Sequence, residues 1–143
     1  MNVPAARSTS HATGPRPWTA AVVSVLVAIE AVALLVVAVA QLVSLVTGHV
    51  LPVTGILFAA VVLTGGAVWL GAAARGAWNG LRWPRAAVLV SQAFLLIVGL
   101  SFLQSVPGGW GLGVAAVAVV TILCLFAPPT VAWMHRTRDD AAR

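Results

Sequence analysis

The feature that most constrains this chain is a long apolar run, residues 19–46, that contains a single carboxyl group. The run reads TAAVVSVLVAIEAVALLVVAVAQLVSLV, with Glu30 near its middle. At about 1.5 Å of rise per residue, a helix of this length exceeds a hydrocarbon core of about 30 Å. Three further apolar runs follow it. The pattern therefore predicts an all-α membrane protein that crosses the bilayer several times.

Composition supports this class and argues against a nucleic-acid-binding protein. Of the 143 residues, 61% are hydrophobic and only 8% are charged, whereas soluble domains have roughly 25% charged residues. The basic charge comes from arginines scattered between the apolar runs, not gathered on one segment. Cys124 is the only cysteine, which excludes a disulfide within the chain.

The chain divides into two polar tails around one helical unit. Residues 1–18 are rich in Pro, Ser and Thr, so we expect a disordered tail there. Short connections force neighbouring spans to be antiparallel, which predicts an up-down-up-down bundle of four transmembrane helices over 19–135. We expect Pro128-Pro129 to stop or kink the last helix, and residues 136–143 to form a second tail. The expected elements are spans at about 19–46, 53–74, 86–106 and 112–127, and an interfacial piece at 130–135.

A cleaved signal peptide is the alternative for the first run. Residues 38–40 (AVA) resemble a cleavage site. However, the apolar stretch before them is longer than the usual 7–15 residues, and Glu30 interrupts it. We therefore interpret residues 19–46 as the first span.

Arginine placement predicts the orientation. All eight arginines lie in the two tails and in the central segment 75–85, which four spans place on one side of the membrane. The positive-inside rule then puts both termini in the cytoplasm. The basic charge comes from Arg alone, with no Lys, and the rest of the chain is rich in Ala, Val and Gly. This suggests the coding bias of a GC-rich bacterium, so we expect a multi-pass protein of the bacterial cytoplasmic (inner) membrane.

Glu30 is the first candidate for function. A charged side chain at mid-bilayer costs about 2.5–3.5 kcal/mol on insertion scales, so a purely apolar helix would have a more favourable free energy of insertion. Three interpretations remain open. Glu30 could hydrogen-bond another helix, with Gln92, Thr64 or Ser91 as partner; it could pair with a basic or polar group of another protein; or it could be a proton site for transport.

Two amide side chains, Gln41 and Gln92, are further candidates for this site. Gln41 and Ser44 lie near the face of Glu30, because eleven residues make about three turns. The segment EAVALLVV, from Glu30, can be aligned with QAFLLIVG, from Gln92, as a faint parallel repeat of one hairpin. We predict a Glu30–Gln92 contact, and the intramembrane polar candidates are Glu30, Gln41 and Gln92.

Two further patterns have both structural and functional interpretations. The central segment alternates arginine with tryptophan, which suits anionic lipid headgroups, a partner protein, or simple anchoring at the interface; its residues are Arg75, Trp78, Arg82, Trp83 and Arg85. Small residues four apart indicate close helix approach, within the bundle or in self-association; examples are Gly55/Ala59, Ala67/Gly71, Ala72/Gly76 and Gly111/Ala115.

The chain offers no pattern of catalytic chemistry. There is no nucleophile–base set and no Gly-rich phosphate loop, and His49 and His135 are expected at opposite membrane faces. We therefore expect a protein that is not an enzyme and that has no cofactor and no metal site.

Two resemblances follow from these motifs. The arginine-rich segment ARGAWNGLRWPRAAVLVSQ (74–92), the PGGWG turn (107–111) and the Pro-terminated last span resemble small four-span membrane proteins of actinobacteria. That resemblance implies a location, not an activity.

The segment VAIEAV around Glu30 is similar to the first helix of the small multidrug resistance exporters, which have four helices and one essential membrane Glu. This resemblance implies proton-coupled export with Glu30 as the proton or cation site. The chain departs from that family: no Lys follows in the span, Ala33-Leu34 replace the usual Gly-Thr, and the aromatic residues expected at a drug site are missing.

These observations favour a small non-catalytic membrane protein, an accessory subunit of a larger membrane complex. Its expected partners are the lipid bilayer and other membrane subunits, or further copies of itself. A proton-coupled small-molecule exporter that uses Glu30 is the alternative.

Overall fold

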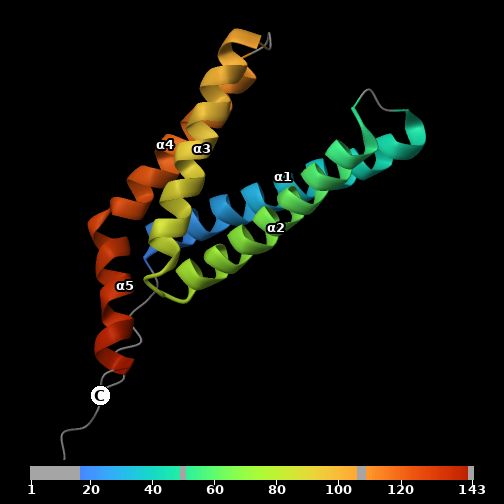
Figure 1. Cartoon of the computed structure of the whole chain (residues 1–143). Helices are drawn as coiled ribbons and strands as arrows, with labels where there is room; N and C mark the ends of the chain where they lie inside the picture. The colour runs from blue at the N-terminus through green and yellow to red at the C-terminus, as the bar shows by residue number, and fades with distance from the viewer. Residues whose placement is uncertain (1–16, 49–50, 106–108, 142–143) are drawn as a thin grey trace, which may run out of the picture.

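The computed structural model describes residues 17–48, 51–105 and 109–141, and all regular structure within them is α-helical. Residues 1–16 of the predicted tail 1–18, and His49, lie outside these residues, whereas Trp18 already belongs to the first helix. The all-α fold is confirmed. The helices are α1 (Trp18–Thr47), α2 (Val53–Trp78), α3 (Pro84–Ser105), α4 (Trp110–Phe126) and α5 (Pro128–Ala141) (Figure 1).

The helices form two antiparallel hairpins, α1–α2 and α3–α4. Helices α1 and α3 leave a common base, and α2 and α4 return to it (Figure 1). The predicted up-down-up-down order is therefore present. The two hairpins pack against each other near the base and diverge away from it, so the helices form an open V (Figure 1).

The helices also give the number of possible membrane crossings. Helices α1, α2 and α3 are long and apolar enough to cross a membrane. Helix α4 has 17 residues, about 26 Å at helical rise, which is short of a full hydrocarbon core. It is bent by 60° from Pro128–Met134 of α5, and the two would make a fourth crossing if they form one broken span. The chain is thus a multi-pass membrane protein.

The break between α4 and α5 has the physical cause that the sequence predicted. Pro128 and Pro129 have no N–H to donate, so they begin a helix well and continue one badly. Helix α4 ends at Phe126, Ala127 is extended, and α5 begins at Pro128. Helix α5 then runs to Ala141, well beyond the interfacial piece expected at 130–135.

The connection between the hairpins is shorter than the sequence indicated. Helix α2 continues through Arg75 to Trp78, and Gly80 then takes a left-handed φ of 74°. The N–H of Leu81 donates to the carbonyl of Gly76 at 2.9 Å, and that of Gly80 to Ala77 at 3.1 Å. This is the Schellman pattern that ends helices at glycine. The loop is therefore only 79–83.

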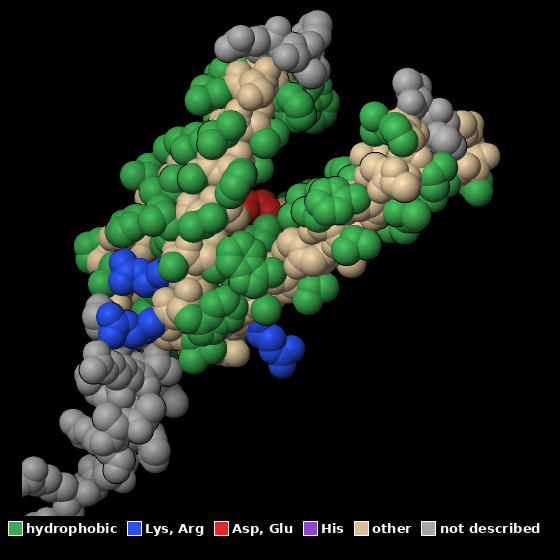
Figure 2. Space-filling model, in the orientation of Figure 1, with side chains coloured by type: hydrophobic (Ala, Val, Ile, Leu, Met, Phe, Trp, Pro, Cys, Tyr) green, Lys and Arg blue, Asp and Glu red, His purple; other side chains and the backbone are tan. Residues whose placement is uncertain are grey.

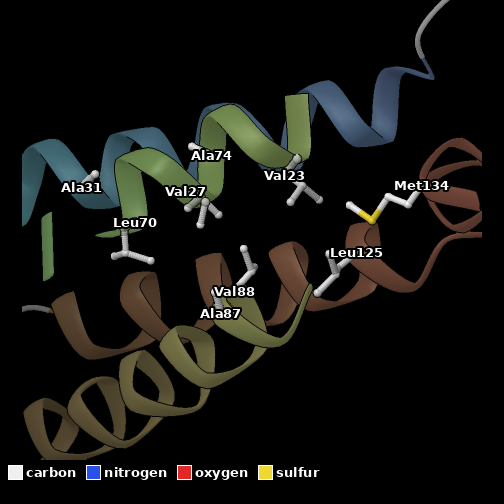
Figure 3. Packing of buried hydrophobic residues seen from close by; sticks show 11 residues of the cluster. Val23, Val27, Ala31, Leu70, Ala74, Ala87, Val88, Leu125 and Met134 are labelled. Carbon is white, nitrogen blue, oxygen red and sulfur yellow. The ribbon is translucent and has the colours of Figure 1, made fainter. Parts of the chain in front are cut away.

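The hydrophobic core lies at the base, where the hairpins meet. Figure 3 shows side chains of α1 and α2 facing those of α3, α4 and α5. Because small residues dominate the α2 side, the helices approach closely there. The core cluster consists of Val23, Val27, Ala31, Leu70, Ala73, Ala74, Ala77, Ala87, Val88, Leu125 and Met134.

Candidate functional site

The predicted contact between Glu30 and Gln92 is confirmed. The side-chain Nε2 of Gln92 donates to Oε2 of Glu30 at 2.9 Å and to Oε1 at 3.0 Å. The two residues are 62 positions apart and belong to different hairpins. Glu30 is the thirteenth residue of the 30-residue α1, about 18 Å along the helix from its start. The pair therefore lies deep in the apolar part of the fold.

The core cluster explains why these two side chains meet. Val27 on α1 and Val88 on α3 belong to this cluster. Val27 lies about one turn before Glu30, and Val88 about one turn before Gln92. Residues one turn apart share a helix face, so packing of the core directs Glu30 and Gln92 toward each other. The pair joins the two hairpins next to this cluster.

The two side chains differ in their access to the surroundings. Gln92 is fully buried, and its Oε1 has no hydrogen-bond partner among the described residues. Glu30 is only half-buried. In Figure 2 the acidic group, the only one among the described side chains, is visible between the two hairpins. We call this open space beyond Glu30 the inter-hairpin cleft.

The other polar candidates are not partners of this pair. Ser91 donates to the carbonyl of Val88 at 2.8 Å, and Ser44 to that of Gln41 at 2.7 Å. Such bonds to the helix's own backbone satisfy a hydroxyl without a neighbouring helix. Thr64 is exposed on α2, and Gln41 is half-buried on α1. Of the three partners considered for Glu30, the structure supports Gln92.

The face of α1 that follows Glu30, expected from the spacing of Gln41 and Ser44, borders the cleft instead of entering a closed bundle. Leu34, Gln41 and Ser44 are half-buried, and Val37 is exposed. Leu34 still packs against the core cluster, and the other three residues follow it on the same helix face toward the open end of the V. The spacing predicted the face correctly, and the divergence of the hairpins determines what that face meets.

The arginine and tryptophan residues of the central segment lie at the base. Figure 2 shows the described basic side chains at that end of the molecule. Arg75, Trp78, Arg82 and Trp83 are exposed, and the rings of Trp83 and Pro84 pack over Gly76. The guanidinium carbon of Arg85 lies 5.6 Å from the centroid of the Phe126 ring, a cation–π contact between α3 and α4. Arg85 therefore stabilises the contact between α3 and α4. The other four residues of the central segment are exposed at the surface of the base.

A second buried polar pair, which the sequence does not predict, joins α5 to α1. The hydroxyl of Thr130 on α5 donates to that of Thr19 on α1 at 2.7 Å. Both residues are buried, and Met134 one turn further on is part of the core. Two threonines 111 residues apart give no signal in a single sequence. They hold α5 to the start of α1.

The Glu30–Gln92 pair can accommodate either protonation state of the carboxyl group. An ionised carboxylate only accepts hydrogen bonds, as it does here from Nε2. A protonated carboxyl could donate to Gln92 Oε1 after the amide turns over, because the amide has one donor end and one acceptor end. Within the described residues, no group of three or more His, Cys, Asp and Glu side chains could hold a metal ion.

The chain has also been compared with known proteins. The comparison with protein-family models, with curated proteins and with solved structures finds no match for it.

Proposed function

We propose that the protein is a small non-catalytic accessory subunit of a larger complex in the bacterial cytoplasmic membrane. The observation that supports this most is the inter-hairpin cleft. Each hairpin is packed along its length, yet the faces that the two hairpins turn to each other are covered only near the base. An apolar V with a polar pair at its closed end suits association with other helices.

The proposed orientation has both termini in the cytoplasm. The described arginine side chains, Arg75, Arg82 and Arg85, all lie at the base of the V (Figure 2). The positive-inside rule favours this end as the cytoplasmic one. Exposed Trp78 and Trp83 at the same end suit the membrane interface.

Affinity purification of the full chain from native membranes in a mild detergent tests the subunit role. We expect a larger membrane protein to copurify in fixed stoichiometry, at a ratio that persists through size-exclusion chromatography. Recovery of the chain alone, or only as a small homo-oligomer, would contradict the proposal. A four-span protein of similar abundance, carrying the same tag, is the control for adventitious capture.

A proton-coupled exporter of small molecules is the second candidate. The observation in its favour is that Glu30 lies at the closed end of a cleft, where a cationic substrate could approach the carboxyl group. The Glu30→Gln variant tests it, because glutamine keeps the size of the side chain and loses the exchangeable charge. Unchanged substrate efflux from membrane vesicles with this variant would reject the exporter.

A further inference from the structure

We infer that the inter-hairpin cleft receives a transmembrane helix of a partner protein, and that this helix has an Arg or Lys side chain at the depth of Glu30. The inference rests on the proposed subunit role and names the chemistry of the partner. Three observations support it: the shape of the cleft, the unused hydrogen-bond acceptor capacity of the Glu30 carboxyl group, and the absence of Lys and Arg from the spans of a second copy.

The cleft is built into the fold, because each hairpin is tight by itself. In α1–α2, Ala38, Ile56 and Ala60 are buried far from the base. In α3–α4, a Cβ on Gly111 would overlap the carbonyl oxygen of Gly99, so the two backbones are in contact. Each half of the V is therefore closely packed along its length, and the space between the halves is not a result of loose helix packing within a hairpin.

One wall of the cleft is the face of α1 beyond Glu30. Val37 lies seven residues, or about two turns, after Glu30 on this face and is 47% exposed. Val36, one residue earlier, points about 100° away and is 61% exposed on the outer side of the hairpin. These two valines distinguish the cleft from the lipid-facing surface.

The Glu30 carboxyl group has unused acceptor capacity in this cleft. A carboxylate can accept about four hydrogen bonds, and in the described residues a single nitrogen, Nε2 of Gln92, supplies its donors. In the hydrocarbon region there is little water to supply the others, and ionisable residues there are normally paired. An occupant of the cleft with a cationic donor at this depth would therefore complement the charge of the Glu30 carboxylate.

Other occupants do not meet this requirement. Acyl chains have no donor at mid-bilayer. A second copy of this chain would present no Lys or Arg, because the sequence from 19 to 74 and from 86 to 135 contains none. It would instead bring a second Glu30, and two ionised carboxylates in a medium of low polarity repel strongly. A foreign helix with an Arg or Lys at mid-span meets the requirement.

Site-specific photo-crosslinking in native membranes tests the inference. A photoreactive phenylalanine derivative is placed at position 37 of the full chain, and at position 36 as the matched control. We expect position 37 to crosslink to one membrane protein, through a peptide from an apolar span that contains Arg or Lys, and position 36 not to do so. Glu30→Gln is expected to lower the yield about tenfold or more, since tenfold corresponds to about 1.4 kcal/mol. Replacing both Glu30 and the partner's basic residue by Leu is expected to restore it.

Because Glu30→Gln could impair folding, a second pair of variants leaves the Glu30–Gln92 bond intact. Val37→Trp fills the cleft and is expected to lose the copurifying complex, whereas Val36→Trp is expected to retain it.

Crosslinking of position 37 to a second copy, to lipid alone or to a span without Arg or Lys would overturn the inference. A crosslinking yield that does not change with Glu30→Gln in a folded variant would also overturn it. A complex that copurifies without a crosslink at position 37 would overturn the cleft site and leave the subunit role standing. A chain that purifies alone would reject the subunit role itself.

Discussion

The Glu30–Gln92 bond joins the two hairpins at the level where they begin to separate. Hydrogen bonds between transmembrane helices are worth about 0.6–2 kcal/mol, because polar groups of the unfolded chain also find partners in the membrane. A bond of this size at the edge of the interface stabilises the contact between the hairpins modestly. It also fixes the rotation of α1 and α3, since slipping either helix would leave a buried polar group unpaired.

The first prediction concerns the energy of this bond. In a double-mutant cycle with Glu30→Leu and Gln92→Leu, we expect a coupling energy of about 0.6–2 kcal/mol. Unfolding in mixed micelles of mild detergent and dodecyl sulfate measures each variant. Gln41→Leu paired with Gln92→Leu is the control, because Gln41 is almost three turns beyond Glu30 on α1. A coupling energy of similar size in that control would show that the cycle measures a general loss of packing and not the Glu30–Gln92 bond.

At the scale of residues, the sequence was informative where one polar group stood out. Glu30 was the only acidic residue in any span, and Gln92 lay on a matching face, so their contact could be predicted. The hydroxyls were not informative, because Ser24, Ser44, Ser91 and Thr121 bond to the carbonyls of their own helices. Thr19 and Thr130 looked the same in the sequence, although they bond to each other.

At the scale of elements, the α3–α4 hairpin depends on one crossing of small residues. A Cβ on Gly99 would lie 3.0 Å from the backbone nitrogen of Ala115, and a Cβ on Gly111 2.7 Å from that of Leu103. Such contacts are possible only where a side chain is missing from each helix. Of the predicted small-residue pairs, Gly111/Ala115 therefore marks a helix crossing, whereas Gly55 and Gly71 meet no neighbour within 4 Å in the described residues.

The second prediction separates these two kinds of glycine on α4. Gly111→Ala is expected to lower the free energy of unfolding by about 1–3 kcal/mol, because backbone atoms have to move apart. Gly113→Ala, with nothing within 4 Å of the added Cβ, is expected to be neutral or stabilising by about 0.5–1 kcal/mol. Micelle unfolding measures both, and equal effects would contradict the close crossing.

The third prediction concerns the core between the hairpins. Leu125 and Leu123 lie two residues apart on α4, with side chains 0% and 66% exposed. Leu125→Ala is expected to cost about 1–3 kcal/mol of stability through lost packing, less than in soluble cores because lipid is as apolar as the core. Leu123→Ala is expected to change stability little. The same unfolding assay measures both variants. A larger loss of stability for Leu123→Ala than for Leu125→Ala would contradict the assignment of the Leu125 face of α4 to the core.

The elements themselves were largely predictable, and their ends were not. The apolar runs located α1 to α4, and Pro128-Pro129 located the break before α5. The predicted spans end at 74 and resume at 86, which leaves Arg75 and Trp78 between them because these residues are polar or interfacial, yet nothing in their side chains stops a helix. The actual stop is Gly80 with its left-handed backbone, followed by Pro84 at the start of α3.

At the scale of the whole molecule, the V shape could not be predicted. In a soluble bundle, polar residues mark the outside of each helix, so the 3.6-residue period shows which face is buried. Here the faces toward lipid, toward the other hairpin and toward the cleft are all made of Val, Leu and Ala. Periodicity therefore cannot tell a closed bundle from two hairpins joined at one end.

The last prediction concerns the placement of the V in the membrane. In a Cys124→Ala background, which removes the only native thiol, a cysteine at His49 samples the connection between α1 and α2, and one at Asn79 samples the loop at the base. Because Arg75, Arg82 and Arg85 lie at the base, the positive-inside rule places Asn79 in the cytoplasm and the α1–α2 connection outside. An impermeant maleimide applied to intact cells is expected to label His49→Cys at once and Asn79→Cys only after lysis. The reverse pattern would invert the orientation and open the cleft toward the cytoplasm. Labelling of both cysteines in intact cells would instead indicate chains inserted in both orientations, which an arginine distribution this one-sided does not favour.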